Sequence, residues 1–202
     1  MKNLVEAFPL HMKEALQIAK DSEWKSSNEQ FRNIIISGLG GSGIGGTIVS
    51  QLIAGEADVP VVVNKTYGIP NLVNEHTLFV ASSYSGNTEE TLEALQEAIA
   101  KGATVACLTS GGKLLEIAKK NGYNYIEMPG GLPPRAAFGY SSTLLFRLLG
   151  NYGFVSAQLL SDLASTPALI EEHIEEIKKA GLSLANKLAG KKPVFYTDAR
   201  ME

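Results

Sequence analysis

Short apolar segments alternate along this chain with longer segments in which apolar residues recur every three or four positions. Residues 34–36 and 61–63 are continuous apolar runs without polar alternation, which is typical of strands buried on both faces. Such runs predict a parallel sheet covered by helices on both sides, because parallel strands need long crossover connections. The predicted strands lie at residues 34–37, 60–63, 78–81, 104–108 and 123–126.

The segments between the predicted strands have the periodicity of helices. The first helix is expected at residues 4–19, with a start or a kink at Pro9, and is expected to lie across the sheet. Residues 44–53 are apolar on nearly all sides, which predicts a buried helix. Strand and helix therefore alternate with short connections, which predicts a three-layer α/β fold. Four more helices are predicted, at residues 89–100, 113–120, 136–149 and 167–188.

The end of the chain departs from this alternation. Residues 194–197 form another apolar run, but the helix that normally follows a parallel strand is missing. We therefore expect a first domain at residues 1–190 and the start of a truncated second domain at residues 191–202. The alternative is that the last strand completes the edge of the first sheet.

Composition and charge argue against several classes of function. The 202 residues carry a net charge of −3, so no basic field attracts nucleic acid or an anionic membrane. No stretch has the length of a membrane span, and the N-terminus lacks the apolar core of a signal peptide. The single cysteine, Cys107, lies in a predicted buried strand and is expected to be inert, which fits a reducing cytoplasm. The His, Cys and Asp residues lack ligand spacing, so neither a metal nor a cofactor is expected.

Two predicted strands lead directly into loops of glycines and hydroxyl residues that open a helix. The loop at residues 38–46 follows the first strand, and the loop at residues 82–90 follows the third. Each would present free backbone N–H groups at a helix N-terminus, which can hold a dianionic phosphate without a metal. Ligands of such sheets bind at the carboxyl ends of the strands, so the two loops predict one ligand held from two sides.

The first loop removes side chains where a ligand would approach the backbone. Gly40, Gly41 and Gly43 have no Cβ atoms, and their neighbour Ser42 supplies a hydroxyl. The glycine spacing formally matches a dinucleotide fingerprint. However, no acidic residue ends the strand at residues 61–63 to bind a ribose, and no Walker lysine follows the loop. The alternative without a ligand is a tight turn before a closely packed helix.

The second loop has more hydroxyl groups than a helix cap needs. Thr88 or Asn87 alone could cap the following helix. Glu89 and Glu90 favour the helix dipole, but they would repel a dianion unless they point away from it. A ligand explains the excess better than a cap does. The four hydroxyl residues, within seven positions, are Ser82, Ser83, Ser85 and Thr88.

Residues 83–91 resemble the phosphosugar-binding loop of sugar isomerase (SIS) domains. Residues 40–46 together with residues 130–135 narrow the resemblance to the bifunctional phosphoglucose/phosphomannose isomerase family, over nearly the whole chain. The Pro-Pro-Arg sequence that ends at Arg135 is the most specific part. The resemblance implies a SIS-domain, flavodoxin-like fold, a homodimer in the cytoplasm, and isomerisation of glucose or mannose 6-phosphate to fructose 6-phosphate.

The resemblance also implies roles for individual residues. Gly41 and Ser42 would contact the sugar or the phosphate from the side opposite the second loop. Arg135 would lie beside C1 and C2 of the sugar and stabilise a cis-enediolate. The alternative for Arg135 is a surface ion pair, for example with Glu127. The residues implied to hold the phosphate are Ser83, Ser85 and Thr88.

An isomerase also needs a base that carries the proton and a group that opens the sugar ring. The resemblance implies that a Glu, a His and a Lys in the second half of a longer chain serve these roles. The histidines of this chain, at positions 11, 76 and 173, are expected to be structural or solvated. The 202 residues are thus expected to bind a sugar phosphate with little turnover. Two alternatives are a non-catalytic phosphosugar sensor, and an isomerase or lyase acting on a different phosphosugar.

Overall fold

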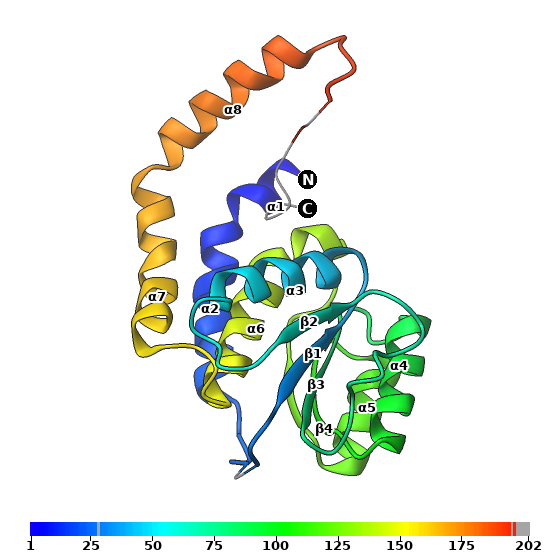
Figure 1. Ribbon diagram of the computed structural model, residues 1–202. Helices are drawn as coiled ribbons and strands as arrows, with labels where there is room; N and C mark the ends of the chain where they lie inside the picture. The colour runs from blue at the N-terminus through cyan, green and yellow to red at the C-terminus, as the bar shows by residue number, and fades with distance from the viewer. Residues whose placement is uncertain (28, 195, 197–202) are drawn as a thin grey trace.

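A computed structural model describes residues 1–27, 29–194 and 196 of the chain, and Figure 1 shows its layers. All described strands lie in one parallel sheet, in the order β2-β1-β3-β4-β5. The predicted parallel sheet is confirmed, with strand ends that shift by at most two residues. Its strands are β1 (Asn33–Ser37), β2 (Val61–Asn64), β3 (Thr77–Ser83), β4 (Thr104–Thr109) and β5 (Asn124–Glu127).

The strand order creates a switch point between β1 and β3. From β1 the chain moves to one side of the sheet to form β2, and it then returns to the other side of β1 to form β3. The carboxyl ends of β1 and β3 are therefore neighbours, and Ser37 pairs with Ala81 in the register. Flavodoxin-like sheets have this order and bind ligands at this position. Both loops singled out from the sequence follow these two strands.

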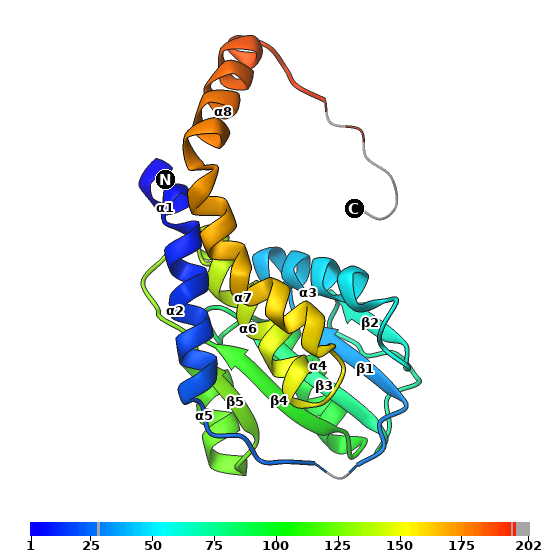
Figure 2. The same cartoon turned by 90° about the vertical axis from the view of Figure 1, so that its left-hand side faces the viewer.

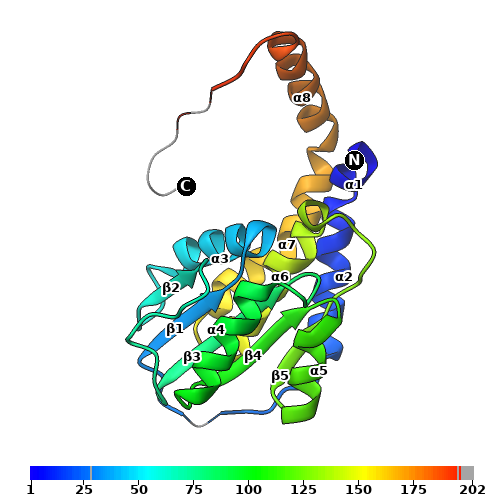
Figure 3. The ribbon, with the colours of Figure 1, turned by 90° about the vertical axis from the view of Figure 1, so that its right-hand side faces the viewer.

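Helices cover both faces of the sheet, as Figure 3 shows for the face with α4 and α5. Ile34 and Ile36 of β1 face a core with α3 and α6, whereas Ile35 between them faces the core with α4 and α5. This alternation explains why the strands are apolar throughout. The helices on the first face are α2 (Phe8–Asp21), α3 (Gly40–Ile53), α6 (Phe138–Asn151) and α7 (Ala157–Glu172). Those on the second face are α4 (Glu89–Ala100) and α5 (Gly112–Asn121).

The first predicted helix is divided at Ala7 into α1 (Lys2–Glu6) and α2, with Pro9 in the first turn of α2. Proline is tolerated there because first-turn N–H groups lack helical acceptors. On the first face of the sheet, α2 packs mainly against α6 and α7 (Figure 2), and its buried Ala15 and Ala19 belong to the core on that face.

The helix after β1 differs from the prediction in two respects. It begins at Gly40 rather than near residue 44, so the glycines of the first loop form its first turns. It is also not buried all round, because Ile44 and Leu52 are 56% and 55% exposed. Residues four apart share a helix face, and Gly46 on another face packs against the sheet. The apolar composition therefore does not mean burial on every side.

The predicted helix at residues 167–188 is also divided. Its first part belongs to α7, which begins at Ala157 and contains the buried Pro167. Its second part is α8 (Ile174–Leu188), which starts after a break at His173. Figures 1 and 2 show α8 projecting from the body of the molecule. Of the predicted strand at 194–197, residues 195 and 197 lie outside the described residues, as do residues 198–202.

The remaining expectations concern the cysteine and the membrane. The predicted burial of Cys107 is confirmed, and burial raises the pKa of its thiol to about 12. Within residues 1–27, 29–194 and 196, no helix combines the length and the apolar character needed to cross a bilayer.

The packing of α3 on the sheet predicts a contrast between two helical glycines. Replacing Gly46 by alanine should lower the free energy of unfolding by about 1–3 kcal/mol. The new Cβ would lie 2.9 Å from Ile36 Cγ2 and 3.2 Å from Val63 Cγ1. Gly181 of α8, whose added Cβ would meet no atom within 4 Å, is the matched control. Gly181→Ala should raise the free energy of unfolding by about 0.5–1 kcal/mol through helix propensity. Urea titration measures both, and equal effects would contradict this packing.

Candidate functional site

The first loop and the end of β3 touch at the switch point. A Cβ atom at Gly38 would lie 2.6 Å from the carbonyl oxygen of Ser82 and 3.0 Å from Cβ of Ser42. Only glycine avoids these contacts, so the absence of a side chain at position 38 allows the two loops to meet. Ser42, one of the predicted ligand residues, is buried beside this contact.

The first turn of α3 presents free backbone N–H groups beside the carboxyl ends of β1 and β3. Leu39 precedes the helix in an extended conformation and forms no side-chain cap, and its carbonyl oxygen accepts the N–H groups of Ser42 and Gly43. The N–H groups of Gly40 and Gly41 have no acceptor among the residues that the structure describes. Such donors at a helix N-terminus attract an anion.

The second loop joins two of the predicted phosphate-binding hydroxyls directly. The Oγ of Ser83 and the Oγ1 of Thr88 lie 2.8 Å apart, and the Gly86 N–H donates to the Ser83 Oγ at 3.1 Å. Thr88 stands at the cap position of α4, but its side chain makes no cap hydrogen bond. A helix cap therefore does not explain this hydroxyl. Ser85 is on the same turn, is exposed, and accepts the Asn87 N–H at 3.2 Å.

Gly86 has a conformation that this turn requires. Its φ is +68°, and a Cβ there would lie 1.8 Å from the carbonyl oxygen of Gly111. Side chains are excluded both by the backbone conformation and by the loop after β4. The hydroxyl cluster is thus held by a backbone turn that is packed against its neighbour.

A third loop, at residues 129–135, returns from β5 toward the first loop. The Tyr84 hydroxyl donates to the Pro129 carbonyl oxygen at 3.0 Å and accepts the Leu132 N–H at 2.9 Å. Further along, a Cβ at Gly41 would lie 3.3 Å from the carbonyl oxygen of Pro134. The third loop therefore contacts both other loops. Sequence reasoning missed Tyr84, whose only signal was an aromatic ring between two serines.

Arg135 lies in the short 3-10 helix η1 (Pro134–Ala136), next to the contact with Gly41. Its side chain is exposed, and no described carboxylate lies within 4.0 Å of its guanidinium group. Glu127, the partner in the alternative interpretation, instead pairs with Lys119 Nζ at 3.2 Å. The suggested Arg135–Glu127 pair is therefore wrong, and in the described structure the guanidinium group is available to a ligand.

The histidines lie apart from the three loops. His11 is buried against α6, where its ring stacks on Tyr140 with centroids 4.7 Å apart. His173 lies at the break between α7 and α8 and contacts Glu176 at 3.2 Å. His76 precedes β3, at the opposite edge of the sheet. The part of the chain that the structure describes holds no group of three His, Cys, Asp or Glu residues that could bind a metal.

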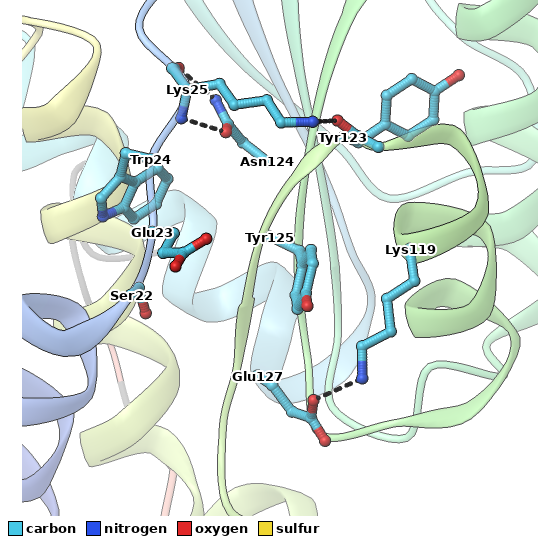
Figure 4. Close-up of a pocket in the computed structure, with 10 residues that line it drawn as sticks. Ser22, Glu23, Trp24, Lys25, Lys119, Tyr123, Asn124, Tyr125 and Glu127 are labelled. Atoms are coloured by element: carbon cyan, nitrogen blue, oxygen red, sulfur yellow. Dashed lines mark hydrogen bonds and ion pairs between the residues drawn. The ribbon is translucent and has the colours of Figure 1, made fainter.

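A hollow of about 530 Å³ lies beside β5, and none of the predicted site residues line it. Figure 4 shows the residues that do. Its polar groups already bond to each other, since Lys119 pairs with Glu127 and the Lys25 N–H donates to Asn124. This hollow lies beside the edge strand rather than at the switch point, and its groups suggest no chemistry. Its walls come from residues 22–25, the end of α5 and β5.

Comparisons with known proteins find a matching domain family and several similar proteins. Residues 29–124 match the family described as SIS domain. A bifunctional phosphoglucose/phosphomannose isomerase from Caldicellulosiruptor bescii is 39% identical over 197 residues, which cover 93% of this chain and 57% of that protein. One from Thermoplasma acidophilum is 48% identical over 124 residues, or 61% of this chain and 37% of that protein.

Solved structures share the fold at low sequence identity. The C-terminal domain of glucosamine-fructose-6-phosphate aminotransferase from Francisella tularensis matches 95% of this chain and 59% of its own. Its TM-score is 0.69 at 15% identity. The chain spans about half the length of the curated relatives it matches. The resemblance inferred from the sequence is confirmed: residues 29–124 match the SIS domain, and the chain is similar over much of its length to several bifunctional phosphoglucose/phosphomannose isomerases.

Proposed function

We propose that this chain is the phosphosugar-binding part of an aldose–ketose isomerase that interconverts glucose or mannose 6-phosphate with fructose 6-phosphate. One observation carries the proposal. The joined hydroxyls of Ser83 and Thr88, the free N–H groups of the first loop and the unpaired Arg135 belong to three loops that contact each other at the switch point.

The phosphate binds between the N-termini of α3 and α4. Ser83 and Thr88 donate their hydroxyl hydrogens to phosphate oxygens, and Ser85 adds a third hydroxyl from the exposed side of the turn. The N–H groups at the start of α4 also face this position, because first-turn groups have no acceptor in the helix. Gly41 and Ser42 contact the ligand from the first loop.

The reaction moves a proton between C2 and C1 of the open-chain sugar. Removing the proton leaves a cis-enediolate, whose negative charge needs a fixed positive partner. Arg135 provides this partner, because its position follows two prolines in a loop held by Tyr84. A guanidinium group keeps its charge at every physiological pH, so it stabilises the oxyanion without exchanging the proton.

The base and the ring-opening group come from a part of the protein beyond this chain. We propose a domain at residues 1–190 followed by a second SIS domain that begins at residues 191–202, in a cytoplasmic homodimer. The 39%-identical relative, of which this chain covers 57%, supports the longer protein. Without the second half the chain binds sugar phosphate but turns over little, since each acid–base group contributes about 10²–10⁴-fold.

Ser83→Ala tests the binding of the phosphate, and Arg135→Ala, described below, tests the chemistry. Ser83→Ala should weaken fructose 6-phosphate binding to this chain at least about tenfold, because it removes a hydroxyl bonded to a charged group. Isothermal titration calorimetry measures this change. Ser165→Ala, on the exposed face of α7, is the control and should leave affinity unchanged.

In the longer gene product, Arg135→Ala should lower kcat for fructose 6-phosphate about 10²–10³-fold with a small change in KM. Arg32→Ala is the control, because Arg32 precedes β1 at the opposite edge of the sheet. A full-length protein that binds sugar phosphate but never converts it would support the sensor function instead. Conversion of another phosphosugar alone, in a substrate panel, would support the third alternative.

The third loop should loosen when its hydrogen bonds to Tyr84 are removed. Tyr84→Phe deletes the hydroxyl that joins Pro129 and Leu132, which should lower the free energy of unfolding by about 1 kcal/mol. The amide hydrogen of Leu132 should then exchange at least about fivefold faster, as measured by hydrogen–deuterium exchange. Tyr125→Phe, on β5, is the control. Unchanged protection of Leu132 in Tyr84→Phe would show that the hydroxyl does not hold this loop.

A further inference from the structure

The connection between β2 and β3 borders the same site, although no sequence pattern singled it out. β2 pairs with β1 in parallel register up to Ser37 and Asn64, and the Gly38 N–H donates to the Asn64 carbonyl oxygen at 3.0 Å. The next residue, Lys65, therefore leaves the sheet directly beside the first loop.

The side chain of Lys65 lies over the first turn of α3. Its Cε is 3.5 Å from the position that a Cβ of Gly43 would occupy. The ammonium nitrogen is one C–N bond of about 1.5 Å further, so it lies within about 5 Å of that position. Lysine thus brings a positive charge to a helix N-terminus that already presents free N–H groups.

The base of this side chain is held in place while its charge remains unpaired. The Asn64 side chain donates to the Thr66 carbonyl oxygen at 3.0 Å, and the Thr66 hydroxyl donates back to Asn64 at 3.1 Å. Lys65 itself is exposed, and no carboxylate of the described residues lies within 4.0 Å of its ammonium group. An exposed cation with an ordered backbone and no protein partner is available to an anionic ligand.

The same connection continues to the acidic start of α4. Negative charge on Glu90 and then on Glu89 raises the pKa of the Tyr67 phenol in this connection. The Ile69 N–H lies 3.4 Å from a carboxylate oxygen of Glu97, further along α4. The connection therefore runs past the helix whose first turn carries the hydroxyl cluster. A phosphate at the first turn of α4 would be repelled by the carboxylates of Glu89 and Glu90, and a nearby cation would offset this repulsion.

We infer that Lys65 is a specificity-determining residue of the phosphosugar site, whose ammonium group pairs with the phosphate of the ligand. This inference rests on the proposed function. Pro134, the residue before Arg135, lies beside Gly41 in the first turn of α3, whereas Lys65 lies beside Gly43. This arrangement assigns Arg135 to the reacting end of the sugar and Lys65 to the phosphate end. Lys65 thereby favours phosphorylated sugars over neutral ones.

The test measures fructose 6-phosphate and fructose binding to the 202-residue chain by isothermal titration calorimetry at low and high salt. Lys65→Gln should weaken fructose 6-phosphate binding about tenfold at low salt, and the loss should shrink as salt screens the pair. Lys65→Arg should retain most of the affinity, because it keeps the charge. Lys113→Gln is the matched control, since Lys113 is an exposed lysine in the first turn of α5 on the same edge of the sheet. It should stay within about twofold of the unchanged chain.

The outcomes separate this inference from the proposed function. Lys65→Gln within about twofold of the unchanged chain, with Ser83→Ala still defective, would overturn the role of Lys65 and leave the proposed function intact. An equal loss in Lys113→Gln would also overturn it, because a general charge effect would then suffice. If the unchanged chain bound no fructose 6-phosphate, the proposed function would fail, and this inference with it. Circular dichroism spectra of all variants establish that each is folded.

Discussion

The close approach of β1 and β3 at their carboxyl ends is the constraint on which the rest of the site depends. At position 38 a Cβ atom would lie 2.6 Å from the Ser82 carbonyl oxygen, so the first loop reaches the second only because it carries glycine there. Parallel pairing of Ser37 with Ala81 brings the two strand ends to this distance. A switch-point topology thus becomes a site in which two helix N-termini can share one anion.

The third loop and the connection between β2 and β3 lie on either side of this centre, held there by contacts between residues far apart in the sequence. Tyr84 of the second loop bonds twice to the third loop, and the third loop meets Gly41 through Pro134. On the other side, Lys65 follows β2 and lies over Gly43. Cations therefore flank a cluster of neutral donors, in a chain whose net charge of −3 provides no general attraction for an anion.

The sequence was sufficient where the signal is local. Apolar runs located every described strand, and α4 was predicted from Glu89 to Ala100 because acidic residues begin it and Lys101-Gly102 ends it. Prediction failed where packing overrides local preference. Helix α3 starts at Gly40 although glycine disfavours helix, because sheet contacts stabilise it. The roles of Tyr84 and Lys65 depend on contacts between distant segments, which periodicity does not encode.

A crystal structure of the chain with fructose 6-phosphate tests the central claim most directly. The phosphate should lie between the first turns of α3 and α4, with the hydroxyl oxygens of Ser83 and Thr88 within about 3 Å of phosphate oxygens. The sugar should extend toward the loop that carries Arg135. A phosphate bound to only one loop, or in the hollow beside β5, would contradict the account of one ligand held from two sides.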